Sequence, residues 1–459
     1  MEYFDLENLE KKAEKLIKEI DEIKLTKEFT NSPNRNLDEL GVVYCLTGND
    51  AALYSKLKQC YIKQQSSEQL EFKTVLAGYA AGKYSEALFL AKDLLVANQS
   101  IEIFQVIIKI CVNHLLIPEW AVHYAKIGLE SHPEHPWLCF SMGIAYSLLG
   151  DQEVYYKDKV TLWEKSRESL QLCKSNRRNY LYHLALIEAK LGNLDEALRN
   201  AAEGYRLCND PYYSALLSLI MTAQEDFTGS LQVIKRGLQG CPSNILLRSA
   251  KVYTYLNLSK ITQDKAPVKK SIISLLKSSL EFLDNASTIP ADERIAGLTS
   301  IKEENSNPEH DSLQDVIKLA ANNSHNPNFQ QALRLAFEAA FAIQDEELIE
   351  FSLNSLQDKK AEQAIYEFHK TGDINGLDNF IENLKACELL AKGRYDSGDK
   401  ARAMSAANQA ISLDNNSAEA WIILGKIHKD YNQLSEAMNC FVAALKCANV
   451  RFSILPVYI

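Results

Sequence analysis

The stretch Ala418–Arg451, AEAWIILGKIHKDYNQLSEAMNCFVAALKCANVR, decides the fold because residue size and residue spacing agree along it. The first part has an apolar face with the i, i+3, i+4, i+7 spacing of a helix. The second part places small residues where a second helix would approach the first. Large residues stand at positions 4, 7 and 24 of the stretch and small ones at positions 8, 20 and 27: Trp421, Leu424, Phe441, Gly425, Ala437 and Ala444. The stretch therefore predicts two closely packed antiparallel helices.

The same register returns along the chain with a period of 34 residues through the first units, is stretched at 151–165, and then resumes. We place further units near residues 34, 68, 102, 136, 178, 211 and 245, and one more at 384. A helix–turn–helix unit of this length is the tetratricopeptide repeat, which buries its apolar face only by stacking on its neighbours. We therefore expect an all-α protein, an α-α superhelix (tetratricopeptide-repeat solenoid) in two lobes.

The breaks in the register predict the domain organisation. Residues 1–30 have an apolar stripe at helical spacing and are expected to form an N-terminal amphipathic helix. Residues 34–283 form the first repeat block. Residues 284–328, rich in Pro, Asn and Ser, are expected to be a flexible insert with a short helix near 312–321. Residues 329–459 form the second block, whose apolar tail is expected to lie on the last helix pair.

Composition narrows the functional classes. The 459 residues are 46% apolar and 24% charged, and only 18 Gly and 11 Pro are present, which favours helices over short strands and turns. The net charge of −10 disfavours non-specific binding to nucleic acid or to an anionic membrane surface. No apolar run approaches the length of a membrane span. Ten cysteines without a CxxC pair indicate a reducing compartment, so we expect a cytoplasmic protein.

Motifs that carry catalytic chemistry are missing from the sequence. It has no Gly-rich phosphate loop, GxSxG elbow or HExxH pair. His132 and His135 flank Pro133 but have no Cys or carboxylate at metal-ligand spacing, so we interpret them as loop histidines. Cys440 and Cys447 share one helical face and are interpreted as core residues. We therefore expect neither an enzyme nor a bound cofactor or metal.

The expected site is instead a groove that holds a partner segment or helix. In tetratricopeptide repeats, positions 2, 5, 9 and 12 of the first helix line the inner face. The clamp of Lys and Asn at positions 5 and 9 that grips chaperone tails is missing, since Phe72 and Leu76, for example, occupy these positions. Tyr155-Tyr156 and Tyr212-Tyr213 are further candidates for partner contact. The expected groove residues are Tyr182, Leu186, Glu419, Ile422, Lys426 and Lys429.

Two stretches resemble the tetratricopeptide repeat protein 7 family. In Trp120–Leu258, the segments GIAYSLLGD, YHLALIEAKLGNLDEAL and LLSLIMTAQEDFTGSLQVI are similar in order and spacing to the central repeats of that family. In Gly398–Pro456, RFSILPV is similar to its closing motif. The family is usually nearly twice as long as this chain, and Arg451 stands where it has Pro. The contacts that the N-terminal half of the family's proteins makes are therefore not implied for this chain.

The resemblance implies a scaffold without catalytic activity. Such proteins join phosphatidylinositol 4-kinase type III alpha to a palmitoylated anchor at the inner face of the plasma membrane, and a hyccin-type subunit binds the same scaffold. The chain would then support phosphatidylinositol 4-phosphate synthesis. The alternative is a generic repeat adaptor in another complex, such as ciliary transport or a ubiquitin ligase. An enzyme with accessory repeats is a third interpretation, disfavoured because no segment remains for a catalytic domain.

Overall fold

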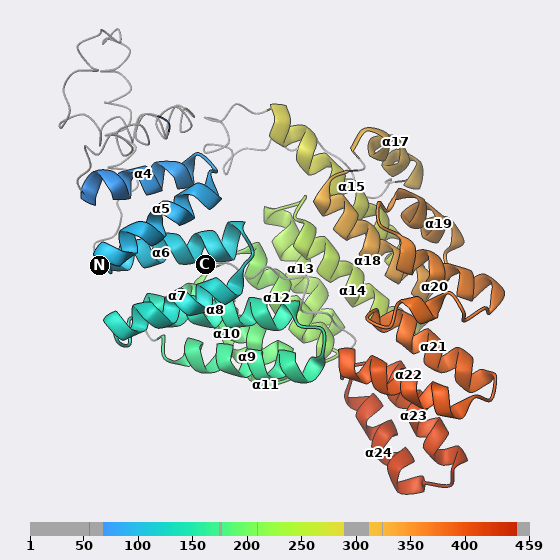
Figure 1. Cartoon of the computed structure of the whole chain (residues 1–459). Helices are drawn as coiled ribbons and strands as arrows, with labels where there is room; N and C mark the ends of the chain where they lie inside the picture. The colour runs from blue at the N-terminus through green and yellow to red at the C-terminus, as the bar shows by residue number, and fades with distance from the viewer. Residues whose placement is uncertain are drawn as a thin grey trace. The chain divides into compact units, whose positions relative to one another are not determined.

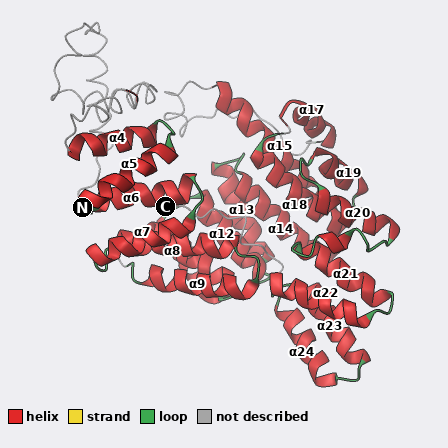
Figure 2. Cartoon of the chain, viewed as in Figure 1, coloured by secondary structure: helices red, strands yellow, loops and turns green. Residues whose placement is uncertain are grey.

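The computed structural model describes residue 55 and residues 68–173, 177–208, 210–288, 312–323 and 325–447. Over these residues every regular element is a helix, and no strand occurs (Figure 2). None of the helices in this part of the chain is long and apolar enough to cross a membrane. The expected N-terminal helix at 1–30, the unit near residue 34 and the apolar tail lie outside the described residues. The all-α fold predicted from the sequence is confirmed.

The chain forms two compact units, and the division falls within one helix, between Ala145 and Tyr146. The described part of the first unit covers residues 68–145 and consists of successive helix hairpins. Its elements are α4 (Glu68–Ala80), α5 (Tyr84–Ala97), α6 (Ile101–Lys109), the π-helical turn η2 (Ile110–His114), α7 (Pro118–Ser131) and the first part of α8 (Pro136–Gln152).

The second unit holds the remaining hairpins, which follow one another from green to red in Figure 1. Most of them are antiparallel pairs in the predicted register. The elements are α9 (Tyr156–Gln171), α10 (Arg177–Lys190), α11 (Leu194–Leu207), α12 (Pro211–Ala223), α13 (Phe227–Gly240), α14 (Ile245–Thr262), α15 (Ala266–Thr288), α17 (Leu313–Asn323), α18 (Pro327–Ile343), α19 (Glu346–Ser355), α20 (Lys360–Thr371), η3 (Leu377–Asn379), α21 (Leu384–Asp396), α22 (Lys400–Leu413), α23 (Ala418–Asp430) and α24 (Leu434–Lys446).

The segment expected to be a flexible insert is described only in part. Its residues 312–323 contain α17, close to the short helix predicted at 312–321, and Val316 of α17 is fully buried. The helices on either side of the segment, α15 and α18, pack against each other within the second unit. The predicted domain limits at 284 and 328 therefore stay predictions, while the described helices place the division between units within α8.

Residue size at two positions of the repeat sets how closely successive hairpins pack. Position 27 is glycine in three units, and each of these glycines faces the side chain at position 3 of the next unit. A Cβ atom on Gly237 would lie 2.8 Å from Leu247 Cδ1, and one on Gly128 would lie 2.9 Å from Leu138 Cδ1. The small residues inferred from the sequence are therefore required by close helix approach.

The turn between the two helices of a unit also follows the register. The residue at position 15 has a positive φ in five units: 70° at Gly82, 83° at Gly192, 64° at Glu225, 86° at Gly398 and 63° at Asn432. Glycine adopts this left-handed conformation without steric cost and asparagine tolerates it, whereas glutamate at Glu225 does so at a cost. A repeated backbone turn therefore accompanies the repeated side-chain pattern.

Candidate functional site

The α21–α23 face is the surface formed by positions 2, 5, 9 and 12 of the two repeats that begin at residues 384 and 418. The two helices lie side by side, and Asn383 and Ser417 cap them by accepting hydrogen bonds from backbone amides of their first turns. Because both caps stand in the same register, equivalent positions of the two helices face the same side. The face consists of Lys385, Glu388, Lys392, Tyr395, Glu419, Ile422, Lys426 and Lys429.

An ion cluster joins the two helices at the first end of this face. Lys385 Nζ lies 3.0 Å from Glu388 Oε2 and 2.9 Å from Glu419 Oε2. The hydroxyl of Ser417 donates a 2.7 Å hydrogen bond to Glu388 Oε1. The cluster therefore links the side chains at position 2 of both repeats, and its carboxylates compensate the positive charge of Lys385.

The two carboxyl groups of the cluster have opposite pKa shifts. Burial raises the pKa of Glu388, which is 8% exposed, even though Lys385 opposes this effect. Desolvation is the largest single effect on Glu419, but the charge and hydrogen bond of Lys385, with smaller contributions from Glu388 and Lys392, together lower the pKa of that carboxyl. Glu419 is therefore the more strongly charged partner of Lys385 and Glu388 the less charged one.

Lys260, at the end of α14, faces the same cluster from another part of the second unit. Desolvation lowers the pKa of its ammonium group. The charge of Glu419 acts to raise this pKa, and the charge of Lys385 acts to lower it. Its side chain is nevertheless exposed to solvent. The end of α14 therefore adds a further exposed cation within electrostatic range of the Lys385 cluster.

The remaining cations of the face point to solvent. Lys392, Lys426 and Lys429 are exposed, and Lys426 Nζ lies 5.9 Å from the centre of the Tyr395 ring. The Tyr395 hydroxyl donates a 3.1 Å hydrogen bond to Asp430. Among the described residues, no carboxylate lies within 4 Å of these three lysines or of Lys260. Ile422 adds an apolar side chain that is 38% exposed.

The structure separates the residues that the sequence placed in the groove. Glu419, Ile422, Lys426 and Lys429 lie together on α23, and their contact with a partner stays a proposal. Tyr182 and Leu186 are only 2% and 1% exposed. The Tyr182 ring packs 5.5 Å from that of Tyr213 and 6.4 Å from that of Tyr212. A buried side chain does not offer a surface to a partner, so Tyr182 and Leu186 are packing residues here.

Sequence reasoning did not single out the α21 half of the face. The signal was available, because Lys385, Glu388, Lys392 and Tyr395 occupy the same four positions as the residues chosen on α23. Lys260 had no comparable signal, since it comes from a helix more than a hundred residues earlier. Only the path of the folded chain brings Lys260 within electrostatic range of Glu419 and Lys385.

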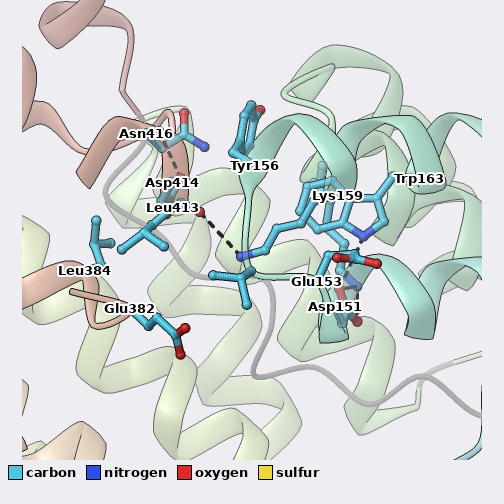
Figure 3. A pocket seen from close by; sticks show the side chains of 13 residues that line it. Asp151, Glu153, Tyr156, Lys159, Trp163, Glu382, Leu384, Leu413, Asp414 and Asn416 are labelled. Carbon is cyan, nitrogen blue, oxygen red and sulfur yellow. Dashed lines mark hydrogen bonds and ion pairs between the residues drawn. The ribbon is translucent and has the colours of Figure 1, made fainter. Parts of the chain in front are cut away.

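A cavity of about 430 Å³ in the second unit lies between α9 and the residues that lead into α21 and α23. Lys159 of α9 crosses it and donates a 3.4 Å hydrogen bond to the backbone oxygen of Leu413 in α22 (Figure 3). On one wall Lys190 Nζ lies 2.7 Å from Asp151, which also accepts a hydrogen bond from Trp163 Nε1. Because these polar groups bond one another across helices distant in sequence, we interpret the cavity as a structural junction.

No reactive centre adjoins the α21–α23 face in the described residues. Cys387 lies behind it on α21, and burial raises the pKa of its thiol to about 11, so the thiol is protonated near neutral pH. No group of three or more His, Cys, Asp or Glu residues with the arrangement of a metal site occurs in the described part of the chain. The face therefore presents charged side chains and one apolar side chain to a partner.

Comparisons with known proteins do not assign the chain to a family. No family model matches the chain, and no curated protein matches it. The human IFIT1 dimer with m7Gppp-AAAA is 14% identical, with a TM-score of 0.44 over 97% of this chain and 95% of that one. The structure of Naa15/Naa10 bound to HypK-THB is 18% identical, with a TM-score of 0.26 over 89% of this chain and 63% of that one. The helix hairpins in 34-residue register are of the tetratricopeptide type.

Proposed function

We propose that this chain is a non-catalytic protein-binding scaffold and that the α21–α23 face is one of its binding surfaces. The observation that carries the proposal is the meeting of positions 2, 5, 9 and 12 from two successive repeats on one solvent-facing surface. Such a surface is fixed by helix packing before a partner arrives, which reduces the entropy lost on binding. In this proposal the fold positions the side chains that bind, and any catalytic activity belongs to the partner protein.

We further propose that the scaffold joins phosphatidylinositol 4-kinase type III alpha, with a hyccin-type subunit, to a palmitoylated anchor at the plasma membrane. The support is the sequence resemblance in Trp120–Leu258 and Gly398–Pro456. One residue that carries this resemblance ties repeats together, since Gln224 Nε2 donates a 2.9 Å hydrogen bond to Asp195 of the preceding repeat. The proposed place of action is the cytoplasmic side of the plasma membrane.

Reconstitution tests the proposal. The purified chain is mixed with the kinase, the hyccin-type subunit and the soluble part of the anchor, and complexes are separated by size-exclusion chromatography. We expect co-elution in a stable complex and no phosphatidylinositol turnover by the chain alone. If none of the three proteins binds while the folded chain retains other proteins in affinity purification, the kinase assignment fails and the generic adaptor in another complex stands.

A further inference from the structure

The α21–α23 face is cationic although the whole chain is anionic. The chain carries a net charge of −10. The face, with the nearby Lys260, holds five lysines (Lys260, Lys385, Lys392, Lys426 and Lys429) against the two glutamates Glu388 and Glu419. A local surplus of the opposite sign to the rest of the protein attracts ligands that the remaining surface repels.

Two glutamates cannot balance five lysines, and Lys385 is the lysine of the face that forms ion pairs with both of them. Lys385 lies 3.0 Å from Glu388 and 2.9 Å from Glu419. Lys260, Lys392, Lys426 and Lys429 have no carboxylate within 4 Å among the described residues. These four ammonium groups therefore have no ion-pair partner among the described residues, and carboxylates of another molecule can supply one.

The spacing of these groups suits a polypeptide segment. Lys392 and Lys426 occupy position 9 of consecutive repeats, so they stand at equivalent places on two neighbouring helices. Ile422 lies one helical turn before Lys426 on the same face and is 38% exposed. A chain that lies across the two helices would meet a cation on α21, and on α23 a second cation with an apolar side chain one turn away.

We propose that the α21–α23 face binds an acidic polypeptide segment, with carboxylates on Lys392 and Lys426 and an apolar side chain on Ile422. This inference rests on the proposed scaffold function and specifies the chemistry of the partner. Lys260 and Lys429 extend the same attraction to flanking acidic residues. The Lys385 cluster fixes the two helices at their shared end, so that the cations are already positioned when the segment arrives.

Phosphate-rich nucleic acid fits this face less well. None of its eight residues is an arginine, and its single aromatic ring, Tyr395, already has Lys426 over its face. Single-stranded nucleic acid is held by aromatic platforms on which bases stack, and this face does not offer a free one. The net charge of the whole chain also repels a polyphosphate backbone at long range.

The test measures peptide binding to the full chain by fluorescence anisotropy. The probes are a labelled peptide of alternating Glu and Leu blocks, a Gln-for-Glu version, a Lys-for-Glu version and a single-stranded RNA of similar length. We expect the acidic peptide to bind, the Gln version to bind about tenfold more weakly, and added salt to weaken acidic-peptide binding. The double variant Lys392→Glu/Lys426→Glu should lose the acidic peptide and gain the Lys version.

Lys235→Glu, on an exposed part of α13, is the matched control, and it should bind the acidic peptide as the parent chain does. Circular dichroism verifies that the variants are folded. Failure of the acidic peptide to bind, equal loss in the control, or tighter binding of RNA than of peptide would each overturn the inference. The outcome for the scaffold function is separate. If the acidic peptide does not bind, but the parent chain and the double variant both still assemble with protein partners, the scaffold function stands and only the acidic-peptide assignment fails.

Discussion

At the residue scale, Lys190 shows how a buried charge depends on one partner. Its side chain is 3% exposed, and its ammonium group lies 2.7 Å from Asp151. We expect Asp151→Ala to lower the free energy of unfolding by about 3 kcal/mol, because the ammonium group would remain buried without a countercharge. Urea denaturation of the variant measures this. In a Lys190→Met background the same substitution should cost much less, and an equal cost there would contradict the explanation.

Glu388 gives a pH-dependent prediction at the same scale. Its pKa is raised in the folded chain, chiefly by burial, so folding favours its protonated form. This contribution to stability is complete below the ordinary pKa of glutamate and is lost as the pH rises through the raised pKa. Glutamine stays neutral, so we expect Glu388→Gln to gain stability relative to the parent chain as the pH rises from acid to neutral.

Thermal unfolding across this pH range measures the difference between Glu388→Gln and the parent chain. Glu419→Gln is the matched comparison and should show the opposite trend. Its carboxylate has a lowered pKa, so the parent chain's advantage over this variant is present above the ordinary glutamate pKa and is lost as the pH falls. The same trend in both variants would contradict the assigned shifts.

At the element scale, the hairpins are kept close by glycine at position 27. A Cβ atom on Gly204 would overlap the ring of Tyr213, which is 3% exposed and cannot move aside. We expect Gly204→Ala to destabilise the protein by about 1–3 kcal/mol, despite the higher helix propensity of alanine. Chemical denaturation measures this cost.

Gly240→Ala is the control, because no atom lies within 4 Å of the added Cβ there. It should leave stability nearly unchanged or raise it slightly. The cost of Gly204→Ala should also shrink when Tyr213 is replaced by alanine, since the overlapping ring is then missing. A cost that does not depend on Tyr213 would show that the glycine matters for another reason.

At the scale of the whole molecule, one contact in the second unit joins two repeats that are far apart in the sequence. Helix α9 packs beside α22, and Lys159 binds the backbone of Leu413, 254 residues further along the chain. In Gly425→Ala the new Cβ would lie 2.5 Å from Phe441, which should loosen the last repeats. We expect faster amide hydrogen exchange in α22–α24 and also in α9, with α4 and α5 unchanged. Exchange that rises only in α23 and α24 would contradict this coupling.

Much of the architecture follows from local pattern. The small residues at positions 8, 20 and 27 predicted the close approaches, and Gly425 does lie against Phe441. Helices α4, α8, α12 and α14 begin at residues where the register begins a unit, because helix periodicity and turn geometry are properties of neighbouring residues. The four inner-face positions likewise identified the α23 half of the α21–α23 face. They did not show that α10 is buried along Leu181–Lys190, since burial depends on what the rest of the chain brings against a helix.

The sequence by itself determined the repeat, its helices and the positions in each repeat that pack or point outward, because a 34-residue pattern of size and polarity specifies one hairpin and its contact with the next. Only the tertiary structure decided which equivalent positions stay open to solvent. It buried Tyr182 and Leu186, left Lys392, Ile422 and Lys426 exposed, and brought Lys260 within electrostatic range of Glu419. The physical reason is that small differences in packing between repeats accumulate along the chain, so the neighbours of a surface far along the sequence are set by all the hairpins between them.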